Sequence, residues 1–197
     1  NDDRLIELMV DAGFVTVFIG IETPDMGSLE ECSKMQNRKT DMMESVKKIQ
    51  SAGIEIQAGF IVGFDNDTPS IFARQIEFIQ KSGIVTAMVG LLTALPKTRL
   101  YQRLSETGRL IKETAADNTK NSTLNFIPKM DRKVLLDGYR KIVNTIYSPK
   151  DYYDRVKTFL LNFRPPKKKT PVFKKYYITA FFSSIWMLGI VDKGRRH

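Results

Sequence analysis

In the first hundred residues, apolar positions follow a helical spacing in some segments and form short continuous runs in others. Three times, a helical pattern of apolar residues runs into a small residue and a glycine, and a short apolar run follows at once. Gly13, Gly53 and Gly83 are these glycines, and each is well placed to end a helix in the left-handed conformation. The pattern predicts a repeat in which a helix precedes each strand.

The three apolar runs are continuous and do not alternate with polar residues. This is typical of parallel strands that helices cover. The sequence therefore predicts an α/β fold with a parallel sheet, either an open doubly wound sheet or an arc of a barrel. The expected strands lie roughly at residues 15–21, 55–63 and 85–93.

Polar residues mark the starts of two helices. Asp41 with Glu44 resembles a capping box, and Thr68 followed by Pro69 forms a suitable N-cap and first helical residue. These signals predict that one helix begins after Asp41 and another at Pro69.

The chain changes character after Arg109. Residues 112–131 are polar and poor in apolar periodicity, and residues 131–163 predict two helices broken at "SPKD". A basic, proline-rich linker and an aromatic helix follow. The uncharged core of that helix, Tyr176 to Val191, is shorter than the ~20 apolar residues of a membrane span. We expect three parts, at residues 1–110, 111–163 and 164–197.

The net charge of +9 is concentrated in the tail. Residues 155–197 hold eleven Lys or Arg and one Asp, a balance of +10, whereas the other residues hold 20 basic and 21 acidic side chains, a balance of −1. A partner that recognises charge, whether phosphates or an anionic membrane surface, would therefore contact the tail.

The sequence does not contain a complete metal site. Cys32 is the single cysteine, and His197, the single histidine, is the last residue. The hydrophobic content of 42% suffices for one core. The first residues resemble a helix already under way, without an initiator Met or a signal peptide, so we expect a fragment.

The strand exits carry the polar residues that could bind a ligand. Glu22 could accept hydrogen bonds from ligand hydroxyls or an ammonium group, or it could cap a helix or pair with a lysine. Gly59 and Gly63 allow a flat ring or a backbone to approach, but packing against helices alone would explain them better. The donor-rich loop 36–39 is more simply a solvated loop, and Arg99 could bind an anion or merely follow a strand.

Several longer stretches together resemble the radical SAM enzymes that carry an N-terminal cobalamin-binding domain and a C-terminal helical domain. Hopanoid-methylating enzymes are among those relatives. The resemblance covers nearly the whole chain. It is carried by "VFIGIETPD", "KMQNRKTDMMESVKKIQSAGIEIQAGFIVGFDNDTPSIF", "AMVGLLTALPKTRLYQRLSETGRL" and "NFIPKMDRKVLLDGYRKIV" with "IYSPKDYYDRV".

The resemblance implies a fold and a cofactor. The fold would be the second half of a parallel (β/α)6 partial barrel, with three strands and their helices, followed by a mainly helical C-terminal region. "GFIVGFDN" would occupy the family's G-x-I-x-G-x-x-E position beside the adenine of S-adenosylmethionine, with Asn66 where Glu is usual. Glu22 would contact the ribose or methionine part. The implied cofactor-binding residues are Glu22, Gly59, Phe60, Ile61, Gly63 and Asn66.

The family's C-x-x-x-C-x-x-C loop is absent from this sequence. The resemblance implies a 4Fe-4S cluster and cobalamin for the full-length protein, but their ligands would lie outside this chain. The chain alone should be inactive, and no catalytic residue can be assigned.

Two functions remain open. The chain could belong to a cobalamin-dependent methyltransferase-like enzyme that acts on a lipid or another unactivated carbon. Its partners would then be that substrate and the missing N-terminal half of the barrel, with peripheral membrane contact and without nucleic acid. Alternatively, it could be a non-catalytic α/β binding module whose basic tail contacts a membrane or nucleic acid. The expected location is the cytoplasm, with peripheral contact to the inner membrane as a further option.

Overall fold

The computed structural model describes residues 2–31, 41–111, 124–165, 175–187 and 191. The chain forms two compact units, residues 1–165 and 166–197. In the first unit the elements are α1 (Asp3–Ala12), β1 (Thr16–Glu22), α2 (Met26–Glu31), α3 (Met42–Ser51), β2 (Glu55–Val62), α4 (Ser70–Ser82), β3 (Thr86–Leu91), α5 (Arg99–Glu106), α7 (Arg132–Ile146) and α8 (Pro149–Asn162). The second unit contains α9 (Lys175–Trp186).

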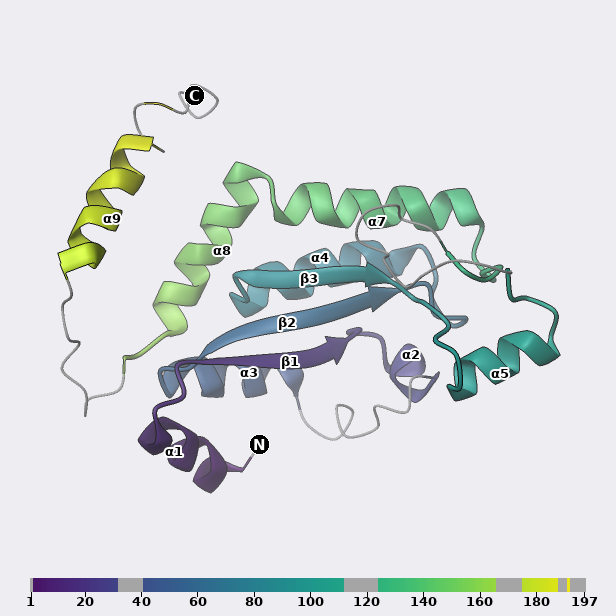
Figure 1. The fold of residues 1–197 in the computed structure, drawn as a ribbon, viewed down its shortest axis with the longest axis horizontal. Coiled ribbons are helices and arrows are strands. Elements are labelled where there is room, and N and C mark those ends of the chain that lie inside the picture. The colour runs from purple at the N-terminus through teal and green to yellow at the C-terminus, as the bar shows by residue number, and fades with distance from the viewer. Residues whose placement is uncertain (1, 32–40, 112–123, 166–174, 188–190, 192–197) are drawn as a thin grey trace. The chain divides into compact units, whose positions relative to one another are not determined.

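The strands form one parallel sheet in the order β1-β2-β3 (Figure 1). Ala58 of β2 lies opposite Ile19 on one side and Ala87 on the other. Helices connect the strands, and α7 and α8 follow. The predicted α/β class, a half barrel of three parallel strands with a mainly helical C-terminal region, is confirmed.

The predicted helix ends are confirmed at all three glycines. Gly13, Gly53 and Gly83 have φ values of 91°, 86° and 70°, in the left-handed region. At Gly83 a side chain would also lack space, because a Cβ atom would lie 2.9 Å from the backbone nitrogen of Phe159 in α8. The end of α4 and the packing of α8 therefore both require this glycine.

The two predicted helix starts differ in outcome. Asp41 is the N-cap of α3, and its carboxylate accepts hydrogen bonds from the backbone N–H groups of Met43 and Glu44. The prediction for α4 is wrong by one residue, since Pro69 is the N-cap and Ser70 the first helical residue. The Thr68 hydroxyl does not cap the backbone but forms a 2.8 Å hydrogen bond with the Ser70 hydroxyl.

The two faces of the sheet differ in burial. On one face Ile56, Ala58, Phe60 and Val62 are buried in a core shared with α3, α4 and α7 (Figure 1). On the other face, which we call the open face, Phe18 of β1 is 58% exposed and Met88 of β3 is 56% exposed. The expectation that helices cover the strands is therefore correct for one face only.

Buried hydrogen bonds hold the C-terminal helices against the sheet. The predicted break at "SPKD" is confirmed, because Ser148 caps α8 and Pro149 is its first residue. In α8 the fully buried guanidinium of Arg155 donates hydrogen bonds to the carbonyl of Ile146 at 2.7 Å and of Val85 at 3.1 Å. These bonds fix α8 at the amino end of β3.

In the second unit, α9 has no buried residue. None of the helices in the described part of the chain is long and apolar enough to cross a membrane. The predicted part boundaries at residues 110 and 163 stay a prediction.

Candidate functional site

Glu22 ends β1 in an unusual conformation. Its φ of 67° lies in the left-handed region, where a residue with a side chain costs roughly 1–2 kcal/mol. The register shifts between Gly20 and Glu22, and this shift places Glu22 opposite Phe60 of β2. The structure therefore brings Glu22 beside the segment that contains the other predicted site residues.

A buried glutamine holds this part of the sheet. The Gln75 amide of α4 donates hydrogen bonds to the carbonyl of Ile61 at 2.8 Å and to that of Glu22 at 3.4 Å. It thus connects the ends of β1 and β2 from the helix layer. Sequence reasoning missed Gln75, because one polar residue in an amphipathic helix gives no sign that it faces the core.

The turn after β2 is closed by Asp67. This buried carboxylate accepts hydrogen bonds from the backbone N–H groups of Gly63 at 2.8 Å and Phe64 at 3.1 Å, and from the Ser28 hydroxyl at 2.7 Å. Burial raises the pKa of Asp67 above its usual value, although these hydrogen bonds oppose the change. Asp67 therefore maintains the shape of the turn at the strand exit.

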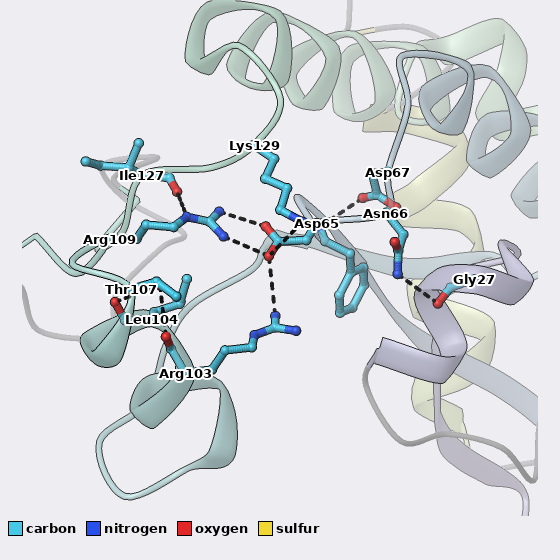
Figure 2. Close-up of polar contacts among 11 residues, drawn as sticks. Gly27, Asp65, Asn66, Asp67, Arg103, Leu104, Thr107, Arg109, Ile127 and Lys129 are labelled. Atoms are coloured by element: carbon cyan, nitrogen blue, oxygen red, sulfur yellow. Dashed lines mark hydrogen bonds and ion pairs between the residues drawn. The ribbon is translucent and has the colours of Figure 1, made fainter.

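Asp65, in the same turn, is surrounded by three cations. Its carboxylate makes a two-bond ion pair with the Arg109 guanidinium, at 2.7 and 2.8 Å. Arg103 approaches to 3.6 Å and Lys129 to 3.9 Å, and Figure 2 shows the three side chains converging on Asp65. The hydrogen bonds from Arg109 hold the pKa of Asp65 below its usual value despite burial.

Asn66 points away from these two carboxylates. Its side-chain amide donates a 3.3 Å hydrogen bond to the carbonyl of Gly27 in α2 (Figure 2). Asp25, which precedes α2, accepts a hydrogen bond from the Ser28 backbone N–H at 3.0 Å and pairs with Arg74 at 2.6 Å. Burial would raise the pKa of Asp25, but these partners lower it on balance. The loops after β1 and β2 are thus bound to each other.

The glycines of the site serve different purposes. A Cβ atom at Gly63, whose φ is 108°, would lie 3.2 Å from the Leu135 side chain of α7, so packing explains this glycine. A Cβ atom at Gly59 would lie 3.2 Å from the Phe18 ring. At Gly90 of β3, by contrast, no atom lies within 4 Å of the Cβ position. Gly90, which sequence reasoning missed, leaves open space on the open face.

The predicted residues of β2 divide between its two faces. Phe60 is buried and packs edge-to-face on Phe78 of α4, with ring centroids 6.1 Å apart. Its side chain therefore faces the helices, and only its backbone is available at the open face. Ile61, half-buried and opposite Gly90, lies on the open face with Gly59. Cys32, residues 36–39 and His197 lie outside the described residues.

The described residues fit one of the implied cofactors. A carboxylate at the end of β1 and the apolar, glycine-bearing open face of the sheet offer an acceptor for hydroxyl or ammonium groups and a surface for a flat ring, as S-adenosylmethionine requires. Within the described ranges no group of three His, Cys, Asp or Glu side chains could hold a metal ion. Whether the six predicted residues bind the cofactor stays a prediction.

Comparison with known proteins identifies relatives over most of the chain. An uncharacterized methyltransferase (sll1242) of Synechocystis sp. is 37% identical over 170 residues, which are 86% of this chain and 32% of that protein. Hopanoid C-2 methylase of Rhodopseudomonas palustris is 33% identical over 194 residues, 95% of this chain and 36% of the methylase.

A bacteriochlorophyllide d C-8(2)-methyltransferase of Chlorobaculum tepidum is more distant, at 26% identity over 133 residues, 67% of this chain and 29% of that protein. The chain thus spans about a third of the length of these relatives. A family model described as a domain of unknown function (DUF4070) matches residues 98–197, half of the chain. The chain therefore belongs to the DUF4070 family, which is found in cobalamin-binding radical SAM proteins, and its predicted resemblance to those proteins is confirmed.

Proposed function

We propose that this chain supplies part of the S-adenosylmethionine site of a radical SAM methyltransferase-like enzyme. The observation that carries the proposal is Glu22, held in a left-handed conformation at the end of β1 and paired with β2, whose open face carries Gly59. The names of the relatives, which are methyltransferases, support the reaction class. One relative is named for a hopanoid and another for a bacteriochlorophyllide, so we propose a lipid or another unactivated carbon as the methyl acceptor.

Each residue has a distinct part in the proposed site. The Glu22 carboxylate accepts hydrogen bonds from the ribose hydroxyls or the ammonium group, and Gln75 fixes its backbone. Ile61 and Gly90, opposite each other on the open face, provide the surface for the adenine. S-adenosylmethionine, when bound, supplies the radical chemistry of the family together with a 4Fe-4S cluster and cobalamin bound elsewhere in the full-length protein.

Replacing Gly90 by Val tests the proposal without disturbing the fold. The new side chain enters space that no atom occupies within 4 Å, and a β-branched residue suits a strand. We expect the full-length Gly90→Val protein to fold normally but to bind S-adenosylmethionine about tenfold more weakly, since overpacking typically costs about 1–3 kcal/mol and about 1.4 kcal/mol is a tenfold change in affinity. Equilibrium dialysis with labelled S-adenosylmethionine measures the affinity.

Thr86→Val is the matched control. Thr86 lies on the same face of β3 but at its amino end, away from the proposed site, and Val has nearly the same shape. Its affinity for S-adenosylmethionine should equal that of the wild type. Unchanged affinity in Gly90→Val, or an equal loss in Thr86→Val, would show that the cofactor does not lie on this end of the open face.

The tail suggests a membrane contact as a second proposal. Along α9 the side chains of Tyr177, Ile178, Phe181, Phe182, Ile185 and Trp186 are all exposed. They cover one half of the helix circumference, whereas the other half carries Thr179, Ala180, Ser183, Ser184 and the exposed ring of Tyr176. We propose that this half enters an anionic membrane surface, a location that would suit an enzyme with a lipid substrate. The alternative of a non-catalytic module predicts that the parent gene encodes no C-x-x-x-C-x-x-C sequence upstream.

A further inference from the structure

A short antiparallel bridge introduces the C-terminal region. Leu110 pairs with Phe126, and the backbone hydrogen bonds from Ile111 to Asn125 at 2.9 Å and from Ile127 to Arg109 at 2.8 Å flank the pair. Phe126 is fully buried in the core of the first unit. The bridge therefore belongs to the same packed body as the sheet.

Two side chains tie this bridge to the strand exits. The Asn125 amide accepts a hydrogen bond from the Ala94 backbone N–H at 3.0 Å and donates one to the Ala94 carbonyl at 2.8 Å. Arg109 donates two hydrogen bonds to Asp65 and a third, from Nε, to the Ile127 carbonyl at 2.8 Å (Figure 2). One tie thus holds the segment after β3, and the other holds the turn after β2.

The Arg109 tie holds the turn that contains the predicted site residues Gly63 and Asn66. Asp65 lies between Gly63 and Asp67, and that turn is closed by the hydrogen bonds from Gly63 and Phe64 to Asp67. Asp65 has a side chain only 9% exposed, and Arg109 is 19% exposed, so both are largely shielded from water. If Arg109 were displaced, the largely buried Asp65 carboxylate would lose its closest hydrogen-bond donors. The turn that contains Asp65 would then be strained.

We propose that Arg109 is a positioning residue, which fixes the Gly63–Asp67 turn through Asp65 and thereby couples the C-terminal region to the cofactor site. The proposal rests on the function proposed above. It assigns Arg109 no contact with the cofactor. Allosteric coupling between two sites typically changes affinity about 5- to 150-fold.

Three variants of the full-length protein separate this role from loss of structure. Arg109→Gln breaks the ion pair. Asn125→Ala removes two hydrogen bonds from the same bridge, where Arg109→Gln removes three, and it affects the segment after β3 instead of the turn after β2. Lys129→Gln removes a positive charge 3.9 Å from Asp65 and is matched for charge.

The first measurement is affinity for S-adenosylmethionine by equilibrium dialysis, well below the unfolding temperature of each variant. We expect Arg109→Gln to weaken binding about fivefold or more, whereas Asn125→Ala and Lys129→Gln should stay within about twofold of the wild type. Asp65→Asn should weaken binding as Arg109→Gln does. The double variant should add nothing further, because the two residues act as one unit.

The second measurement is hydrogen exchange of the Gly63 and Phe64 amides, which needs neither turnover nor a known substrate. Exchange should accelerate in Arg109→Gln but not in Asn125→Ala. The coupling is refuted if Arg109→Gln binds as the wild type does, or if Asn125→Ala weakens binding equally. Failure of the wild type itself to bind S-adenosylmethionine would instead refute the proposed function.

Discussion

Glu22 combines a strained backbone with a carboxylate at the exit of an apolar strand. Residues with a side chain seldom adopt φ values near 67°, and they do so where the surroundings hold them in place. Here the register shift in β1 and the hydrogen bond from Gln75 do so. A strained polar residue at a strand exit is typical of a binding site.

We predict opposite effects of Glu22→Gly on stability and on binding. Glycine relieves the left-handed strain, so the free energy of unfolding should rise by about 0.5–1 kcal/mol after the entropy cost of glycine. Affinity for S-adenosylmethionine should fall about tenfold with the lost carboxylate, since hydrogen bonds to charged groups contribute about 1.5–3 kcal/mol. Urea unfolding and equilibrium dialysis of the full-length protein measure the two quantities.

Glu22→Ala is the control, because it loses the carboxylate but keeps the strained conformation. It should bind as weakly as Glu22→Gly without the gain in stability. Lower stability in Glu22→Gly would mean that the carboxylate maintains the fold, and the functional interpretation of Glu22 would then lose its support.

The carboxylates after β2 show where residue patterns mislead. The sequence "DND" suggests a group of ligand-binding side chains, but Asp67 closes its own turn and Asp65 pairs with Arg109, 44 positions away. The partner of Asp65 could not be predicted, because the ion pair depends on how the chain returns to the sheet after α5. That Glu22 lies beside β2 was predictable, since the ends of parallel strands meet at one edge.

At the scale of elements, α7 is fitted to α4 through Gly138. A Cβ atom at this position would lie 2.3 Å from the ring of Phe72, so the two helices approach more closely than any other residue would allow. This contact joins the helical region to the half barrel. It explains a glycine in the interior of a helix, where glycine is otherwise unfavourable.

Gly138→Ala should destabilise the protein although alanine is the better helix former. Alanine gains about 1 kcal/mol in helix propensity, but overpacking against an aromatic ring costs about 1–3 kcal/mol, and at 2.3 Å we expect the upper end. The net loss should be about 1–2 kcal/mol in urea unfolding. Adding Phe72→Leu should recover part of it, and a purely additive double variant would show that the two positions are not in contact.

Local signals predicted the elements well where the backbone alone decides them. The left-handed conformations of the three glycines and the break at Pro149 follow from backbone sterics. The residues responsible, glycine and proline, can be read directly from the sequence. The predicted start of α4 was wrong by one residue, because the Thr68 hydroxyl forms a hydrogen bond with the Ser70 hydroxyl and not with the helix backbone. The open face could not be foreseen, since a continuous apolar strand does not reveal which side remains uncovered.

At the scale of the whole molecule, the basic tail predicts salt-dependent binding to lipid vesicles. The full-length protein should sediment with vesicles that contain anionic lipid and much less with neutral ones, and high salt should weaken binding. Each Lys or Arg near such a surface contributes about 1 kcal/mol, so replacing Lys167, Lys168 and Lys169 by Gln should lower the partition coefficient about 100-fold.

Replacing Lys133, Lys141 and Lys150 by Gln is the matched control, because it removes the same charge from the first unit. This control should sediment as the wild type does. Binding that is absent, equal for neutral vesicles, or unaffected by the tail substitutions would show that α9 and its basic flank have no role at a membrane.

The central claim is that S-adenosylmethionine binds at the carboxyl ends of β1–β3, on the open face of the sheet. A structure of the full-length protein with S-adenosylmethionine bound tests it most directly. We predict that the Glu22 carboxylate lies about 3 Å from a hydroxyl or ammonium group of the cofactor, and that the adenine lies within about 4 Å of Ile61 and Gly90. A cofactor on the helix-covered face, or one that contacts no residue of this chain, would contradict the claim.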